Sequence, residues 1–207
     1  MITPNKNCSL CPRLKKYRDK YKIIKPEWYN SPVESFGNLD SRILIVGLAP
    51  GLKGANKTGR PFTGDHAGKL LYNSLIKYKL ASGIYNEDIS DGLKMINTRI
   101  TNSVRCVPPN NKPNTLEKKT CQKFLASEIH NMKNLKIILA LGTIAHEELL
   151  KIFNKKLSLY KFKHGNVHNI NNILLFDSYH CSRYNTQTKR LTKKMFDDVI
   201  FSMTEII

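Results

Sequence analysis

The fold is decided by one stretch, Arg42 to Asp65, which reads RILIVGLAPGLKGANKTGRPFTGD. It opens with an uninterrupted apolar run, and continuous rather than alternating apolarity is typical of a parallel strand covered on both faces. A glycine-rich loop follows at once, and such a loop after a strand first suggests a site for a nucleotide phosphate. The spacing GxxxxGK followed by Ser or Thr is absent, however, and so is GxGxxG. A nucleotide-binding enzyme is therefore only a weak alternative.

Three further apolar runs predict strands, and helical patterns lie between them. The strands are expected at residues 42–49, 95–102, 136–142 and 172–180. The helices are expected at residues 68–80, 116–132, 143–154 and 191–207. Because strand and helix alternate, we predict a three-layer α/β/α sandwich around a central four-stranded parallel sheet. At 207 residues the chain predicts a single domain, residues 1–207.

The charge of the chain points to a polyanionic partner. Lys and Arg number 34 against 16 Asp and Glu, which gives a formal net charge of +18. No run approaches the roughly 18 apolar residues of a membrane-spanning helix. The N-terminal sequence MITPNKNCSLCPRLKKYRDK lacks the apolar core of a signal peptide. We therefore expect a cytoplasmic, nucleoid-associated monomer that binds nucleic acid and no membrane.

Five cysteines are present, at positions 8, 11, 106, 121 and 181. An odd count and a reducing cytoplasm both argue against disulfides. Cys8 and Cys11 have the CxxC spacing, and Cys106 and Cys121 form a second pair. Four thiolates from two distant segments suit either a tetrahedral zinc ion or an iron-sulfur cluster, and unrelated buried thiols are the alternative. No general base stands near them in the sequence, so a structural site is expected, one that holds the N-terminal tail to the domain.

Polar side chains gather where the predicted strands end. Asn102 ends the second strand, His180 ends the fourth, and the glycine-rich loop follows the first. Ligands of parallel sheets bind at the carboxyl ends of the strands, where these segments meet. The packing of a core does not require polar residues there, so the sequence predicts an active site at this edge.

Three motifs in order, together with the four cysteines, resemble one known family. The motifs are GLAPGLKGANKTGRPFTGDHAGKLL from Gly47, TNSVRCVPPNNKPNT from Thr101 and SYHCSRYNTQTKRLT from Ser178. They resemble the iron-sulfur uracil-DNA glycosylases, and among these the family 5 branch, whose first motif has an apolar residue after its glycine. The resemblance runs from Cys8 to the helix after Leu191, which is nearly the whole chain.

This resemblance implies a fold, a cofactor and a reaction. It implies a four-stranded parallel sheet between helices and a [4Fe-4S] cluster on Cys8, Cys11, Cys106 and Cys121. The implied reaction is excision of uracil from single- or double-stranded DNA by base flipping, with hypoxanthine or xanthine as further substrates. Because no lysine stands out as an imine-forming nucleophile, we expect direct hydrolysis that leaves an abasic site. The alternative is an inactive iron-sulfur protein of the same fold that only binds nucleic acid.

Four side chains carry the expected chemistry. Phe62 offers a stacking face for the flipped base, and Asn102 can donate and accept at its pairing edge. His180 can donate to the oxygen where negative charge develops. Asp65 either orients water and steadies the cationic sugar, or caps the following helix, and the two roles weigh about equally. Backbone of the first loop is expected to approach the substrate, at Gly47, Leu48, Ala49 and Gly51.

Two positions depart from the family pattern. Leu48 stands where most uracil-DNA glycosylases have Asp, Asn or Glu to position water, although the family 5 branch tolerates this. Cys181 replaces the proline of the motif that follows His180. We do not count Cys181 among the cluster ligands.

The expected contacts with DNA come from residues that surround the opening of the predicted active site. Arg60, Arg183 and Lys189 are the expected phosphate contacts, with support from Lys53, Lys57, Lys112 and Arg190. Tyr184 is the candidate wedge for the minor groove.

Overall fold

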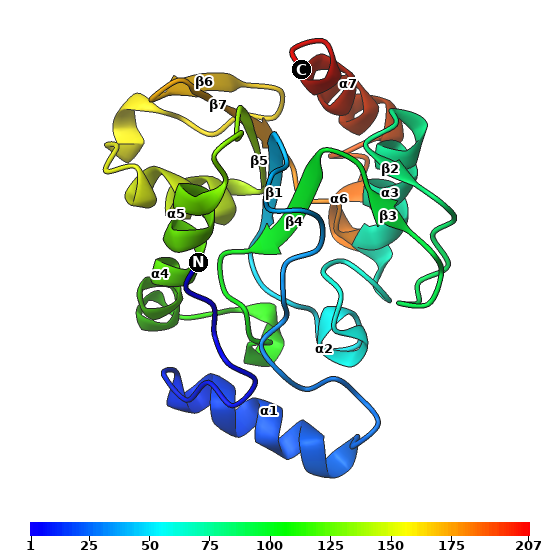
Figure 1. Ribbon diagram of the computed structural model, residues 1–207, viewed down its shortest axis with the longest axis vertical. Coiled ribbons are helices and arrows are strands. Elements are labelled where there is room, and N and C mark those ends of the chain that lie inside the picture. The colour runs from blue at the N-terminus through cyan, green and yellow to red at the C-terminus, as the bar shows by residue number, and fades with distance from the viewer.

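A computed structural model describes all residues from Met1 to Ile207. At its centre lies one five-stranded sheet with the strand order β4-β1-β5-β7-β6 (Figure 1). Four strands run parallel, as predicted: β1 (Ile43–Gly47), β4 (Thr98–Asn102), β5 (Ile137–Leu141) and β7 (Ile173–Ser178). The fifth strand, β6 (Val167–Ile170), pairs antiparallel with β7 and was not predicted. The sheet is therefore a parallel one with an antiparallel edge, not purely four-stranded.

Helices cover both faces of the sheet, which confirms the three-layer prediction. Alternate residues of a strand point to opposite faces. Ile43 and Ile45 of β1 accordingly pack in the core beneath α3 (His66–Lys77) and α7 (Lys193–Thr204). Leu44 and Val46 pack in the core beneath α4 (Thr115–Asn131) and α5 (Thr143–Ile152). All four of these side chains are fully buried, which explains the unbroken apolar run in the sequence.

The second predicted strand is shorter in the structure than expected. Asn97 adopts a left-handed conformation, with φ of 49°. This turn divides the predicted run, so β4 begins only at Thr98. The preceding residues, Lys94 and Met95, form β3 and pair with β2 (Ala81–Ser82) in a separate two-stranded ribbon. An Asn tolerates this backbone region better than most residues, which is why the division occurs there.

A turn and a helix cap connect β4 to α4. A short 3-10 turn, η1 (Pro109–Asn111), lies in the proline-rich stretch before the helix. The N-cap of α4 is Asn114. Asn114 Oδ1 accepts from the Glu117 backbone N–H at 2.8 Å, and Glu117 Oε2 accepts from the Asn114 N–H at 2.8 Å. These two bonds make a reciprocal capping box.

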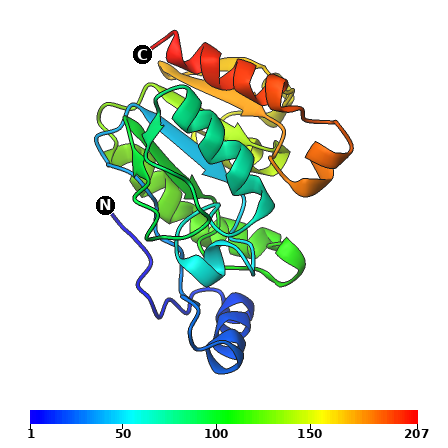
Figure 2. The ribbon, with the colours of Figure 1, turned by 90° about the vertical axis from the view of Figure 1, so that its right-hand side faces the viewer.

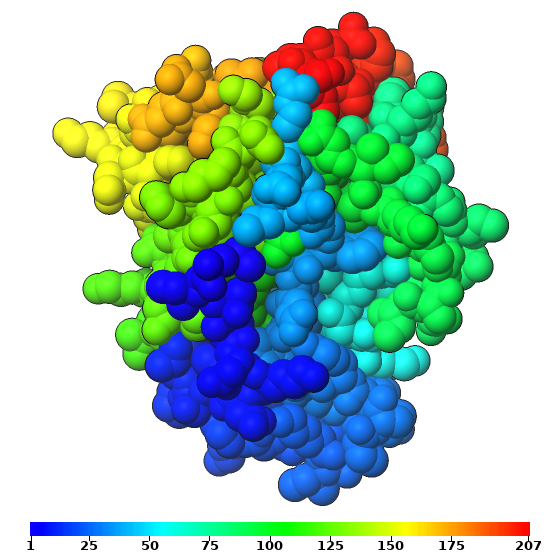
Figure 3. Space-filling view, in the orientation of Figure 1, coloured from blue at the N-terminus to red at the C-terminus, as the bar shows by residue number.

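The N-terminal segment carries a helix that the strand and helix patterns did not predict, α1 (Pro12–Ile24). Figure 2 shows α1 at the opposite end of the molecule from α7. The first residues run over the surface from α1 (Figure 3), and the backbone N–H of Ile2 donates to Ser127 Oγ of α4 at 2.7 Å. The chain after α1 contacts the glycine-rich loop, where the Asn56 side chain donates to Asn30 Oδ1 at 2.9 Å. None of the helices is long and apolar enough to cross a membrane.

Candidate active site

A cavity of about 370 Å³ opens at the carboxyl ends of β1, β4 and β7. The predicted side chains of Phe62, Asp65, Asn102 and His180 all line it, although they come from four separate segments. The structure therefore brings together the side chains that the sequence predicted for one site. The other lining residues are Leu48, Ala49, Pro50, Gly51, Ala55, His66, Ala67, Asn111, Ser182 and Arg183.

Gly47 allows two of these side chains to meet over the end of β1. A methyl group placed on Gly47 would lie 2.5 Å from Asn102 Oδ1 and 2.5 Å from Phe62 Cζ. Real Cβ atoms do not approach other atoms so closely, so no larger residue fits here without displacing one of them. Asn102 follows from the register, because it pairs with Gly47 across the parallel strands. Its side-chain amide makes no hydrogen bond within the protein, so donor and acceptor both stay free for a ligand.

Phe62 belongs both to the core and to the cavity wall. It is only 6% exposed and packs in the same apolar cluster as Leu71. Its backbone is left-handed, with φ of 54°, an unusual conformation for a bulky residue. The Tyr85 hydroxyl donates to the Phe62 carbonyl at 3.0 Å and helps to hold that conformation. The ring centroid lies 5.9 Å from that of His180, so both rings border the same space.

The two carboxylate oxygens of Asp65 do different things. Oδ1 accepts from the Gly68 backbone N–H at 3.2 Å and caps α3. Oδ2 lies over the glycine loop, where a methyl group on Gly54 would sit 2.7 Å from it and one on Gly51 3.4 Å. Asp65 therefore caps α3 and also lines the cavity, so its position suits both of the roles that the sequence left open. Burial raises the pKa of Asp65 above its ordinary value.

His180 faces the cavity as an uncharged ring. Burial lowers the pKa of its imidazole to about 4, so the ring is neutral at pH 7. Neither ring nitrogen is hydrogen-bonded to the protein, while the backbone carbonyl of His180 accepts from Asn185 Nδ2 at 2.8 Å. That contact fixes the backbone and leaves both ring nitrogens open to a ligand, one as an N–H donor and the other as an acceptor.

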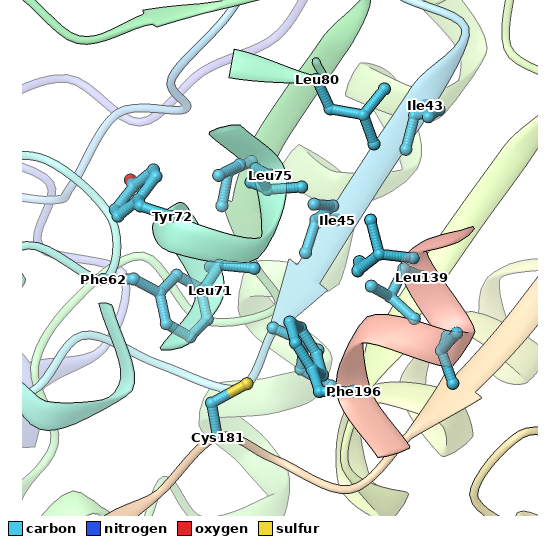
Figure 4. Close-up of a cluster of buried hydrophobic side chains, with 14 of the residues drawn as sticks. Ile43, Ile45, Phe62, Leu71, Tyr72, Leu75, Leu80, Leu139, Cys181 and Phe196 are labelled. Carbon is cyan, nitrogen blue, oxygen red and sulfur yellow. The ribbon is translucent and has the colours of Figure 1, made fainter. Parts of the chain in front are cut away.

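Cys181 lies in the core and not in the cavity. Its side chain is fully buried in the same apolar cluster as Phe62 and Phe196 (Figure 4). The thiol fills space among these rings, and it stands apart from the four other cysteines. Leaving it out of the predicted ligand set agrees with this position.

Sequence reasoning missed part of the cavity wall. Asn111 reaches it from the η1 turn in a left-handed conformation, with φ of 56°. His66 lines the wall and its Nε2 lies 2.9 Å from Thr186 Oγ1 on the short helix α6 (Arg183–Gln187). A run of N-N before Lys is a signal for such left-handed turns, whereas nothing in the sequence pairs His66 with Thr186.

Arg60 differs from its predicted role as a DNA contact. It is 6% exposed, and its two terminal nitrogens donate to the two carboxylate oxygens of Asp91 at 2.8 and 2.7 Å. Its Nε donates to Thr63 Oγ1 at 2.7 Å. The guanidinium also lies 5.2 Å from the ring centre of Phe36 and 5.5 Å from that of Tyr72. Because all these donors are engaged in the interior, Arg60 holds the glycine loop in place and offers nothing to a phosphate.

The other predicted DNA contacts lie on the surface. Arg183 lines the mouth of the cavity, and Tyr184 next to it is 69% exposed. Lys189 is also exposed, in the turn after α6. Asn185 and Thr186 bind this segment to His180 and His66, so the exposed side chains are carried by an anchored element.

The four predicted cysteine ligands meet around a second, smaller cavity beside α1. Cys8, Cys11, Cys106 and Cys121 line it together with Leu14 and Phe124. The backbone N–H of Arg105 donates to Cys121 Sγ at 3.3 Å. Arg18 lines the same cavity, and its Nη2 donates to the Cys8 carbonyl at 2.6 Å.

Comparison with known proteins agrees with this architecture. The profile of the uracil DNA glycosylase superfamily matches residues 34–203, and the chain belongs to this superfamily. A type-5 uracil-DNA glycosylase of Thermus thermophilus is 40% identical over 200 residues, covering 93% of this chain and 90% of that protein. The type-5 enzyme of Pyrobaculum aerophilum is 35% identical, covering 94% and 86%. A type-4 enzyme of Thermotoga maritima is 36% identical over 161 residues, covering 76% and 67%. Within the superfamily, the chain belongs with the type-5 proteins.

Proposed function

We propose that this protein is a base-excision-repair glycosylase that hydrolyses the N-glycosidic bond of uracil in DNA and leaves an abasic site. The observation that carries the proposal is the cavity at the strand ends, where an aromatic face, a free amide, a neutral imidazole and a carboxylate converge. Its type-5 relatives are named uracil-DNA glycosylases, which supports the same activity. We propose that it acts as a monomer of a single domain. Its proposed location is the cytoplasm, in association with the chromosomal DNA.

The residues divide the work on a flipped nucleotide. The base must leave the stack at a cost of a few kcal/mol, and stacking on Phe62 returns about 1 to 3 kcal/mol. Asn102 reads the adjacent carbonyl and N–H of uracil with its acceptor and donor. As the bond breaks, negative charge grows on the uracil and positive charge on the sugar. The neutral His180 donates to the uracil oxygen, and such a donor contributes about 100- to 1000-fold in rate.

Asp65 acts on the sugar side of the N-glycosidic bond. The Asp65 carboxylate lines the cavity, where its negative charge stabilises the cationic sugar and orients the attacking water. Leu48 lines the cavity with an apolar side chain and offers no polar group of its own to hold the water. Backbone of Gly47, Leu48, Ala49 and Gly51 then approaches the base or sugar. This loose wall leaves room for hypoxanthine or xanthine as further substrates.

The proposed DNA surface surrounds the mouth of the cavity. Arg183 and Lys189 contact phosphates, and Tyr184 enters the minor groove as a wedge that props the duplex open. Lys53 and Lys57 are exposed on the glycine loop and extend the same basic surface. The net charge of +18 supports strong attraction to the DNA backbone.

Arg183 and Arg60 provide a matched test of this surface. We expect Arg183→Ala to reduce the slope of log affinity against log salt by about one, because one phosphate contact is lost. Arg60→Ala should leave the slope unchanged but lower the free energy of unfolding by about 3 to 5 kcal/mol, since Asp91 stays buried without its partner. Fluorescence anisotropy with an undamaged duplex and urea unfolding measure the two effects. A reversed pattern would place Arg60 on the DNA surface after all.

We also propose that Cys8, Cys11, Cys106 and Cys121 hold a [4Fe-4S] cluster. Two features of the structure support this fit. Arg18 Nε is buried beside these cysteines without a hydrogen-bond partner, and an anionic cluster of thiolates would satisfy it. The four cysteines, which come from two distant segments of the chain, line one cavity together, as the ligands of one cluster must. When bound, the cluster supplies a cross-link that fastens the N-terminal tail to the domain.

The experiment that tests the function uses the purified chain and duplexes that carry a single uracil or hypoxanthine. Alkali-labile breaks at the uracil, without breaks before alkali treatment, are the expected result. Breaks before alkali would indicate a lyase. Binding of the duplex without any break would favour the second candidate, an inactive binding protein. The free amide of Asn102 and the free imidazole of His180 speak against that candidate, because a protein that only binds DNA does not need them.

A further inference from the structure

A second group of ligand-forming side chains lies away from both the cavity and the cysteines. His146 of α5, His168 of β6 and Asp177 of β7 bring their ligand atoms to within 4.8 Å of one another. His146 Nδ1 lies 2.7 Å from Asp177 Oδ1, and His168 Nε2 lies 3.2 Å from Asp177 Oδ2. None of the three lines the active-site cavity. The function proposed above gives them no role.

The position of these residues follows from the sheet. Leu175 of β7 and Ile170 of β6 point into the core beneath α4 and α5. By the alternation of a strand, Asp177 and His168 point to the same side, where His146 projects from α5. Asp177 and His146 are buried, and the side chain of His168 is 14% exposed. The group is therefore enclosed on the inside and open to solvent through His168.

The hydrogen bonds of His146 indicate that a proton or a metal ion lies between its Nδ1 atom and the Asp177 carboxylate. His146 Nε2 lies 2.8 Å from the carbonyl oxygen of Tyr160, which can only accept, so Nε2 carries a proton. In the neutral ring, Nδ1 then presents a lone pair to a carboxylate oxygen at 2.7 Å. Two electron-rich atoms at this distance need either a second proton or a metal ion between them.

The arrangement has the features of a metal site. A ligating histidine usually donates its other ring N–H to a carbonyl or carboxylate, and His146 does this to Tyr160. Two imidazoles and one carboxylate are a ligand set for Zn²⁺, which leaves one position for water. Tetrahedral ligands about 2.0 to 2.1 Å from zinc lie about 3.3 Å apart, so the two His–Asp separations of 2.7 and 3.2 Å would widen on a bound ion. The two imidazole nitrogens, which lie within 4.8 Å of each other, would adjust to the same spacing. We propose that His146, His168 and Asp177 form a site for a divalent transition-metal ion, with Zn²⁺ as its probe.

The proposed ion ties three elements together behind the active site. It would join α5, β6 and β7, and Asp177 precedes His180 on the same segment. The adjoining segment is already ordered by its own contacts, because the Tyr179 backbone N–H donates to His164 Nδ1 at 3.2 Å. The site would therefore stabilise the end of β7 and the antiparallel edge strand, without contact to substrate.

Zinc content provides the direct test. The purified protein, with its iron retained, is treated with EDTA to remove other divalent metal ions and is then dialysed against Zn²⁺. Mass spectrometry measures its zinc and iron content. We expect about one zinc per chain in the wild type. His168→Gln should weaken zinc binding at least tenfold, since it removes one ligand. It is the variant of choice because His168 lies at the open side of the site and on an edge strand. His130→Gln, an exposed histidine at the end of α4, should bind as the wild type does.

Thermal unfolding gives an independent readout. Zinc at a hundredfold excess over its Kd should raise the wild-type midpoint by about 5 to 10 °C, and it should raise that of His168→Gln far less. Zinc that binds the wild type and His168→Gln equally, or that displaces iron, would overturn the proposal. The absence of retained zinc would overturn it as well. In that case protons, one in each of the two His–Asp177 contacts, would hold the three side chains together.

Discussion

Asp65→Asn is expected to lower the single-turnover rate of uracil excision by about 100- to 1000-fold, while affinity for the duplex changes by less than about threefold. The substitution keeps an oxygen that can accept from Gly68, because Asn and Asp cap helices equally well. It removes only the negative charge that Oδ2 presents to the cavity. Rapid quench with a uracil duplex measures the rate, and anisotropy measures the affinity.

The pH dependence of Asp65→Asn distinguishes loss of the carboxylate charge from loss of folding stability. Because burial raises the pKa of Asp65, the active carboxylate is lost as pH falls through this raised value. The acid limb of the rate profile should therefore disappear in Asp65→Asn. A carboxyl whose pKa is raised by folding destabilises the protein when it ionises, so stability falls as pH rises through that range. Asp65→Asn should accordingly be no less stable than the wild type at pH 7.

Another helix cap provides the control. Thr192 caps α7 by accepting from the Met195 backbone N–H at 3.2 Å, and it does not line the cavity. Thr192→Ala should lower the free energy of unfolding by about 1 kcal/mol and leave the excision rate unchanged. Excision by folded Asp65→Asn at nearly the wild-type rate would assign the water to backbone groups of residues 47–51.

The sequence was sufficient for the parts of the fold that depend on local pattern. The unbroken apolar runs predicted the parallel strands because each strand is covered on both faces. Asn102 and His180 could be placed in one site because the carboxyl ends of parallel strands meet at one edge. The edge strand β6 was missed because its short sequence VHNI is half polar and only its last residue is buried.

Side-chain partners distant in the sequence could not be predicted. Arg60 lies in a basic loop of the sequence. Only the three-dimensional structure shows that both of its terminal nitrogens donate hydrogen bonds to the Asp91 carboxylate. The double use of Asp65 also depends on three-dimensional geometry, since one oxygen faces Gly68 and the other faces Gly54. The cluster of His146, His168 and Asp177 joins three elements whose contact no spacing rule indicates.

Cys8→Ser is expected to reduce iron from about four atoms per chain to below one and to release the N-terminal tail. A cross-link that closes a loop of about 100 residues contributes ~4 to 5 kcal/mol, and each kcal/mol shifts the unfolding midpoint by about 2 to 4 °C. The midpoint should therefore fall by about 10 °C or more. Iron and sulfide analysis, thermal unfolding and limited proteolysis of residues 1–30 measure the three effects.

Cys181→Ala separates loss of a ligand from loss of a buried thiol. Cys181 is fully buried in the core between α3 and α7, far in sequence from both cysteine pairs. Its replacement leaves only a small void, with a cost of about 1 kcal/mol, and should keep all the iron and an intact tail. Full iron content in Cys8→Ser, or loss of iron in Cys181→Ala, would contradict the assignment of the cluster. Zinc in place of iron in the wild type would contradict it as well.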